Sequence, residues 1–247
     1  MKKRDASLAA FAIFVFWQIA ALIIDRNILP SPLEVIPVFF KEIINGNMLE
    51  HALASFWRVM ASMFLSVLLA APAGLLLGQS QKLNRFFSPV IYLLYPVPKV
   101  VLVPIVLLFF GVGDLPKILI IFMILFFQIL VLVRDQAAAL PSELIQSVRS
   151  LGAGRRALFR LVYLPASLPA ILTALRQSVG TAVAVLYITE TFATQRGLGY
   201  YIYFNASTLL DYPAMYAGVL AMSLLGLGLY FSVDWLEHRL CKWQFVE

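Results

Sequence analysis

The chain of 247 residues is poor in the residue types from which most enzyme centres are built. It has one cysteine, Cys241, so it can form neither an intrachain disulfide nor a cysteine metal cluster, and thiol redox chemistry is not expected. Its two histidines, His51 and His238, lie far apart, and the sequence has no His-Glu-x-x-His pair, Gly-x-Ser-x-Gly motif or Gly-x-x-x-x-Gly-Lys-Ser/Thr phosphate loop. We therefore predict that the chain is not an enzyme and does not bind ATP through such a loop.

Charged residues are also scarce. They make up 13% of the chain, whereas hydrophobic residues make up 62% and the mean hydropathy is +0.88. A soluble domain is about 45–50% apolar, so this composition predicts an integral membrane protein. The net charge of +6 does not indicate nucleic-acid binding, because the basic residues are dispersed between apolar runs and are not gathered on one face.

Six apolar runs are long enough to cross the hydrocarbon core of a bilayer. They are continuously apolar and do not alternate as membrane strands would, so we predict an all-α polytopic membrane protein. No internal repeat or linker divides the chain, which predicts one domain. The predicted spans are residues 8–24, 55–78, 89–110, 117–133, 168–192 and 214–235.

Lysine and arginine are distributed unequally around these runs. With the N-terminus inside, thirteen fall on the cytoplasmic side, five fall outside and Lys99 lies within a span, which predicts that both termini are cytoplasmic. The basic N-terminus and run 8–24 also fit a secretory signal, but the run is longer than a usual signal core, so we expect a peripheral helix. The spacing of apolar residues over 34–44 predicts a short helix at the outer surface. The five outer residues are Arg26, Lys41, Arg58, Lys117 and Arg196.

The third predicted span is interrupted by Tyr95-Pro96-Val97-Pro98-Lys99, and Pro104 follows. Each proline removes a backbone donor and crowds the preceding turn. A membrane helix tolerates this where other helices or a water-filled cavity satisfy the freed groups. Two interpretations stay open, a kinked packing helix and a helix that lines a transport pathway.

The segment 143–160 is amphipathic, with three apolar residues at helical spacing and four arginines. Gly152 and Gly154 allow the chain to reverse between two short helices, which predicts a hairpin that protrudes into the cytoplasm. The alternative is a solvated loop held by anionic lipid headgroups. The apolar residues are Leu144, Val148 and Leu151, and the arginines are Arg149, Arg155, Arg156 and Arg160.

The same segment resembles the cytoplasmic coupling loop of ABC importer permeases, which reads Glu-Ala-Ala, three residues, Gly-Ala, about eight residues and Ile-x-Leu-Pro. Gly152-Ala153 precede Val162-Tyr163-Leu164-Pro165 at that spacing, whereas Gln146-Ser147-Val148 replace Glu-Ala-Ala. Further motifs extend the resemblance, to the nitrate, sulfonate and taurine branch, over nearly the whole chain. They are Leu29-Pro30-Ser31-Pro32, Pro96-Val97-Pro98-Lys99, Phe110-Gly111-Val112-Gly113, and Glu190 with Gly197-Leu198-Gly199.

The resemblance implies a type I ABC importer permease in the cytoplasmic (inner) membrane of a bacterium or archaeon, with one domain over residues 1–247 and a coupling loop at 142–165. It implies a homodimer, two ATP-binding cassette ATPase subunits, an extracytoplasmic solute-binding protein and no nucleic acid. The chain would hold no cofactor or metal, since ATP and Mg belong to the partner ATPase. The implied ATPase-coupling residues are Leu144, Gln146, Val148, Arg149, Leu151, Gly152, Ala153, Phe159, Leu164 and Pro165.

Polar residues within the predicted spans are candidates for the translocation pathway, because such residues are rarely placed in lipid without a function. They are Lys99, Gln128 and Glu190. For Glu190 the alternative is structural pairing with Arg196 or Lys99, and for Gln128 it is an amide that bridges helices.

The resemblance implies a small polar, anionic solute such as a sulfonate, nitrate or taurine. Related permeases for thiamine-precursor pyrimidines and other heterocycles keep a second substrate class open. A channel or scaffold with no ATPase partner is the alternative from another class. Six tyrosines would suit an aromatic solute, although tyrosine is also typical of membrane interfaces. They are Tyr92, Tyr95, Tyr187, Tyr200, Tyr201 and Tyr203.

Overall fold

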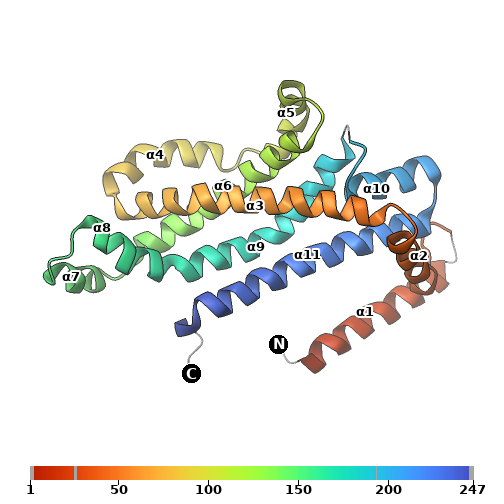
Figure 1. The fold of residues 1–247 in the computed structure, drawn as a ribbon, viewed down its shortest axis with the longest axis horizontal. Helices are drawn as coiled ribbons and strands as arrows, with labels where there is room; N and C mark the ends of the chain where they lie inside the picture. Colours follow the sequence, from red (N-terminus) through yellow and green to blue (C-terminus); the bar gives the residue numbers. More distant parts are fainter. Residues whose placement is uncertain (1–2, 25–26, 193, 245–247) are drawn as a thin grey trace. The chain divides into compact units, whose positions relative to one another are not determined.

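The computed structural model describes residues 3–24, 27–192 and 194–244, without the side chains of Lys3, Ala6 and Arg155; Lys2 and Arg26 of the charge distribution lie outside it. Every regular element within these ranges is a helix (Figure 1). The chain divides into two compact units. The first contains Met1–Phe56 and Glu190–Leu225, and the second contains Trp57–Thr189 and Gly226–Glu247.

Over the described ranges, five helical segments are long and apolar enough to cross a membrane, and a bent pair of helices provides a sixth. The pair joins Gln81–Leu94 to Lys99–Phe110 at 73°, so the break lies at the two prolines as predicted. The all-α membrane fold is therefore confirmed. The five segments are Ser7–Ile24 of α1 (Lys3–Ile24), α3 (Met48–Gln79), α6 (Asp114–Ala138), Arg156–Thr191 ending in α9 (Leu164–Thr191), and α11 (Tyr212–Leu240).

In the first unit, α1 is the most exposed of these segments, with only 6% of its apolar window buried. Its outward apolar side chains include Phe16, which is 74% exposed, and a bilayer rather than water would cover such a surface. The predicted short helix is α2 (Pro32–Ile44). Proline suits the first turn of a helix, and the Ser31 N–H donates to Glu34 Oε2 (3.0 Å) at this start.

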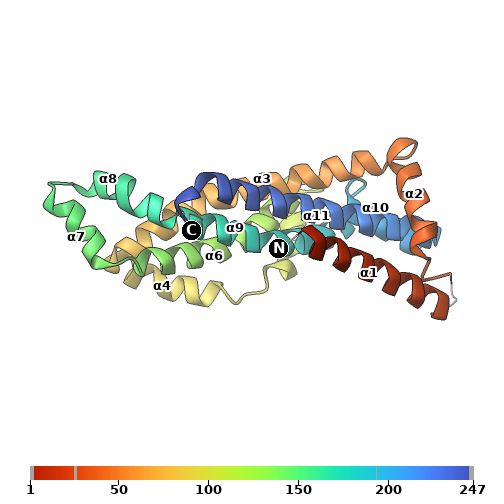
Figure 2. The ribbon, with the colours of Figure 1, turned by 90° about the horizontal axis from the view of Figure 1, so that it is seen from below.

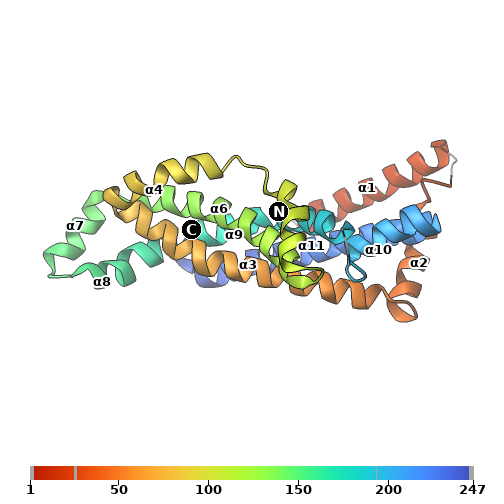
Figure 3. The ribbon, with the colours of Figure 1, turned by 90° about the horizontal axis from the view of Figure 1, so that it is seen from above.

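In the second unit, small residues at every fourth position of α3 bring it close to α6 (Figure 3). The hydroxyls of Ser62 and Ser66 donate to the carbonyls of Ile118 and Phe122 on α6 (3.2 and 3.3 Å). At Gly78, an added Cβ would lie 2.6 Å from Ala137 Cβ. Small residues permit such close packing of membrane helices. The stripe is Ser62, Ser66, Ala70, Gly74 and Gly78.

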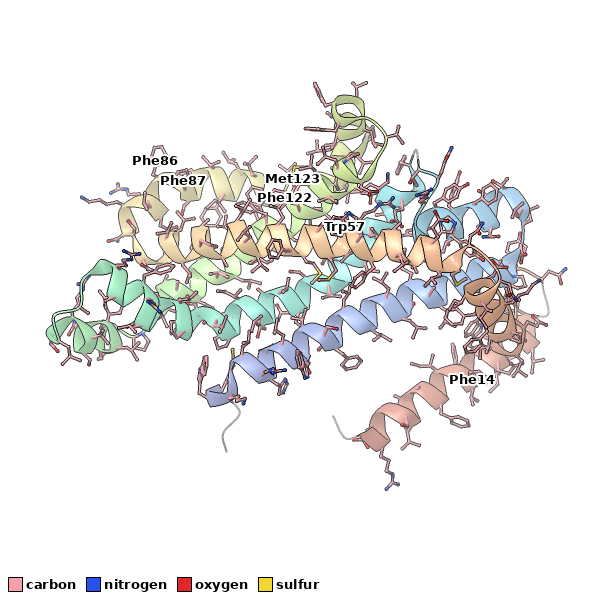
Figure 4. The ribbon with its side chains drawn as sticks, viewed as in Figure 1. Phe14, Trp57, Phe86, Phe87, Phe122 and Met123 are labelled. Atoms are coloured by element: carbon pink, nitrogen blue, oxygen red, sulfur yellow. The ribbon has the colours of Figure 1, made fainter. Side chains whose placement is uncertain are left out.

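The broken span of the second unit contains α4 (Gln81–Leu94), the short 3-10 helix η1 (Lys99–Leu102) and α5 (Val103–Phe110). Phe86 and Phe87 project from α4 (Figure 4), and Phe86 is 73% exposed. Such exposed aromatic side chains fit a surface in contact with lipid or with another helix.

Candidate functional site

The segment between α6 and α9 folds into a helical hairpin, which we call the α7–α8 hairpin and define as residues 142–163. It contains α7 (Ser142–Ser150), α8 (Arg155–Leu158) and the π-helical turn η2 (Phe159–Tyr163), which continues into α9. Figures 1 and 2 show α7 and α8 together beyond the ends of α6 and α9. The reversal needs Gly152, whose φ of +82° is rarely adopted by other residues.

The hairpin has a small core of its own. Leu158, Val162 and Tyr163 are buried in it. Partly buried apolar side chains pack around them, and two of these, Leu140 and Ile145, are not among the predicted site residues. They are Leu140, Ile145, Val148 and Ala153.

This core divides the predicted apolar face of α7. Val148 packs inward, whereas Leu144 is 45% exposed and Leu151 is 85% exposed. Gln146 and Arg149 are exposed too. Within the described residues Leu151 has little cover, so only a surface of another molecule could bury its side chain. The hairpin therefore presents an apolar tip and a cationic side.

The π-helical turn has a cause in the sequence. The N–H of Leu164 donates to the carbonyl of Phe159, five residues earlier. Pro165 follows and cannot donate a backbone hydrogen bond, which disfavours a regular α-helical turn before it. Phe159 and Pro165 are half-buried and Leu164 is 39% exposed, so these predicted site residues form the base of the hairpin rather than its tip.

Two of the three pathway candidates line one cavity in the second unit. The cavity has a volume of about 350 Å³ and includes Lys99 from the break of the third span and Gln128 from α6. Gln128 Oε1 is buried and has no hydrogen-bond partner in the part of the chain that the structure describes. The other lining residues are Tyr95, Val97, Pro98, Val100, Ile124, Phe127, Thr181 and Val185.

The ammonium of Lys99 is held by its own chain. It donates to the carbonyls of Leu94 (2.7 Å), Tyr95 (2.8 Å) and Val97 (3.1 Å) and lies 4.6 Å from the ring centre of Phe127. These carbonyls belong to the end of α4 and to the break after it, where a helix has no internal donors for its last C=O groups. Lys99 therefore stabilises the break, and all three of its N–H groups are used.

Glu190 lies in the first unit, within a buried hydrogen-bonded cluster. Ser55 Oγ lies 2.9 and 2.8 Å from its two carboxyl oxygens, and the Gly199 N–H donates to Oε2 (2.8 Å). The Leu198 N–H donates to Ser55 Oγ (2.8 Å), and the Gly197 N–H donates to His51 Nδ1 (3.0 Å).

This cluster caps α10 (Leu198–Phe204) with side chains from other helices. The first N–H groups of a helix lack internal partners and favour negative charge nearby. Three of them, from consecutive residues, are accepted by His51, Ser55 and Glu190. These contacts support the structural interpretation of Glu190. Arg196 Nε forms an ion pair with Glu50 Oε1 (3.0 Å).

Comparison with known families decides the class of the protein. A family model described as "binding-protein-dependent transport system inner membrane component" matches residues 62–242. The chain belongs to this family. It is a multi-pass inner-membrane permease of an ABC importer, in which a separate ATPase subunit hydrolyses ATP and a solute-binding protein is a further partner. This confirms the predicted class and decides against a channel or scaffold without an ATPase.

Individual relatives of the permease differ in the solute that their names give. The taurine transport system permease protein TauC of Escherichia coli (strain K12) is 29% identical over 240 residues, which cover 95% of this chain and 87% of TauC. The formylaminopyrimidine transport permease protein ThiX of Halalkalibacterium halodurans is 27% identical over 241 residues, which cover 97% and 96%. The substrate is therefore not decided by these relatives.

A solved structure supports the fold. A chain of the MetNI methionine ABC transporter in an inward-facing conformation matches the permease with a TM-score of 0.71 at 19% identity. The match covers 81% of this chain and 98% of that chain.

The permease also contains an ionic network that the sequence reasoning missed. Arg176 of α9 pairs with Asp234 and lies 3.4 Å from Glu237 Oε2, both on α11, and Thr173 Oγ1 donates to Glu237 Oε1 (2.9 Å). In the sequence, Arg176 counts only as one of the thirteen basic residues assigned to the cytoplasmic side. The spacing of Asp234 and Glu237, three residues apart on one helix face, was the available signal.

Proposed function

We propose that the permease forms a homodimer that carries a small polar, anionic solute into the cytoplasm, and that the α7–α8 hairpin of each protomer docks one ATPase subunit. Both termini are cytoplasmic in this arrangement, and the chain is one functional domain. The lysine and arginine distribution supports the orientation. The similarity to TauC, a taurine permease, supports a sulfonate as the solute, and the similarity to ThiX makes a thiamine-precursor or other heterocycle the alternative.

The observation that carries the docking proposal is the exposed tip of a hairpin with its own core. Leu151 is 85% exposed although Leu158, nearby in sequence, is 3% exposed. A permease powered by a separate ATPase needs a firm projection that transmits movement, because packed interfaces switch between discrete arrangements. The hairpin core provides firmness, Leu144 and Leu151 provide an apolar contact, and the exposed Arg149 and Arg156 provide rim charges that guide association.

The test is co-purification of the ATPase with a Leu151→Ser variant. Leu151 makes little contact with the rest of its own chain, so the variant should fold, while loss of a central apolar contact should weaken docking about tenfold or more. Ile44→Ser on α2, where Ile44 is 74% exposed, is the matched control and should retain the ATPase. Equal retention by both variants would refute docking through the tip of the hairpin.

A further inference from the structure

Two cavities of the second unit lie along the same pair of helices. The first, of about 350 Å³, uses Gln128 of α6 and Thr181 of α9. The second, of about 490 Å³, uses Gln136 of α6 and both Thr173 and Gln177 of α9. Figures 1 and 2 show α6 and α9 side by side.

The lining residues of the two cavities follow one another along both helices. Leu132, which lines the second cavity, follows Gln128 by four residues, and Thr181 follows Gln177 by four residues. Residues four apart lie on one face of a helix, one turn apart. The cavities therefore occupy successive turns of one groove, which we call the α6–α9 groove and define by the lining residues of both.

The groove combines apolar walls with a few neutral polar side chains. Its polar side chains on α6 and α9 are amides and hydroxyls, and among its described lining residues Lys99 alone is charged. Gln136 and Gln177 are exposed in the described chain. Polar side chains avoid lipid and face protein or water-filled space. The five polar residues are Gln128, Gln136, Thr173, Gln177 and Thr181.

Lys99 contributes little attraction to a solute in this groove. Its three N–H groups are taken by the carbonyls of Leu94, Tyr95 and Val97. Those carbonyls lie at and just after the end of α4, where a helix carries the equivalent of about half a negative charge. The positive charge is therefore partly offset, and no N–H remains for an incoming anion.

We propose that the α6–α9 groove is the solute track of the permease and that it recognises a small oxyanion or zwitterion through neutral hydrogen-bonding groups, not through a fixed charge. Amide N–H groups and the Thr181 hydroxyl donate to sulfonate or carboxylate oxygens, and the amide oxygens accept from an amino group; the Thr173 hydroxyl already donates to Glu237. Hydrogen bonds of this kind hold the solute weakly enough for it to move from one turn of the helices to the next, as passage through a pathway requires. This proposal rests on the proposed function, since it assumes an importer of polar solutes.

The test measures charge preference inside the groove with two thiol reagents of opposite charge. Gln177→Cys and Thr181→Cys, each with Cys241→Ser, are made in the purified complex with its ATPase and treated with methanethiosulfonate ethylsulfonate (anionic) or methanethiosulfonate ethyltrimethylammonium (cationic). We expect both positions to react with both reagents. The anionic and cationic rates, each divided by the rate with a free thiol, should agree within about fivefold. Ile13→Cys on exposed α1 is the lipid-facing control and should not react.

Two results would overturn the proposal. One is absence of reaction at both groove positions, which would make the groove a dry packing surface. The other is a more than fivefold preference for the anionic reagent at Thr181→Cys that disappears when Lys99→Met is added, because a fixed cation would then control the groove. Failure of the proposed function is seen separately, as retention of the ATPase by Leu151→Ser.

A transport assay links the groove to function. Gln177→Leu keeps a similar side-chain size and removes the hydrogen-bonding groups, so binding-protein-dependent uptake of radiolabelled taurine should fall about tenfold while the ATPase still co-purifies. Gln18→Leu on α1 makes the same change outside the groove and should retain uptake. Equal uptake by both variants would count against the groove as the track.

Discussion

Gly197 is the most sensitive test of the cluster that caps α10. Its φ is +124°, and a Cβ added there would lie 2.3 Å from the carboxyl carbon of Glu190 and 2.4–2.5 Å from its oxygens. Gly197→Ala must therefore distort the backbone and displace a carboxyl group that accepts hydrogen bonds from Ser55 and Gly199. We expect the variant to be strongly destabilised.

The magnitude follows from these two effects. A non-glycine residue in such a backbone conformation costs about 1–3 kcal/mol. Each hydrogen bond to the carboxyl group contributes about 1.5–3 kcal/mol if it is ionised. Loss of one bond together with the backbone strain gives about 4 kcal/mol, which corresponds to a fall in melting temperature on the order of 10 °C for a chain of this size.

The assay is thermal unfolding of the detergent-solubilised permease, followed by fluorescence. Gly228→Ala is the control, because Gly228 is helical, an added Cβ would meet no atom of another segment within 4 Å, and alanine is more favourable in a helix than glycine by about 1 kcal/mol. Its melting temperature should be unchanged or slightly raised. In a Glu190→Ala background the steric part of the Gly197→Ala effect should disappear. Equal destabilisation with and without the Glu190 side chain would refute the clash.

Two further predictions concern the second unit. Cys241 is fully buried, and burial together with the nearby Glu237 raises the pKa of its thiol, so little thiolate is present at pH 7.5. Labelling of Cys241 by a maleimide should therefore be at least tenfold slower than labelling of glutathione, and its rate should rise with pH. Labelling as fast as that of glutathione would contradict this prediction. Arg176→Met should lower the free energy of unfolding by about 3–5 kcal/mol, because it removes the guanidinium that pairs with the carboxyl groups of Asp234 and Glu237. Adding Asp234→Asn and Glu237→Gln should restore most of this stability in the same melting assay. No recovery in the triple variant would show that Arg176 acts through packing.

Much of the fold was predictable because membrane helices leave a local signal. The six apolar runs, the break at Pro96 and Pro98 and the reversal near Gly152 each depend on residues close together in the sequence. The period-four stripe of small residues on α3 was equally readable and was missed. The family was predictable from the spacing of Gly152-Ala153 and Leu164-Pro165. The match of the family model to residues 62–242 confirms that prediction.

The partners of buried polar groups were not predictable in this way. Glu190 was expected in the pathway or beside Arg196 or Lys99, but the observed hydrogen bonds come from Ser55, 135 residues earlier, and from the α10 backbone. Such partners depend on tertiary packing, which a single sequence does not reveal. The inward position of Val148 has the same cause. On α7 it lies three residues from Ile145, and the core formed by later residues decides which neighbours it joins.

The proposed docking site and the proposed solute track are joined by one helical stretch. Arg156–Thr191 runs from the α7–α8 hairpin through the π-helical turn into α9, which carries Gln177 and Thr181 of the groove. A movement imposed on the hairpin by an ATPase would therefore reach the groove without crossing a loop. Along the groove, Arg176 ties α9 to Asp234 of α11, so α11 would move with it. A helix that was joined to the hairpin by a flexible linker would lose this displacement. In the permease the turn before Pro165 is helical, and its residues Val162 and Tyr163 are part of the hairpin core.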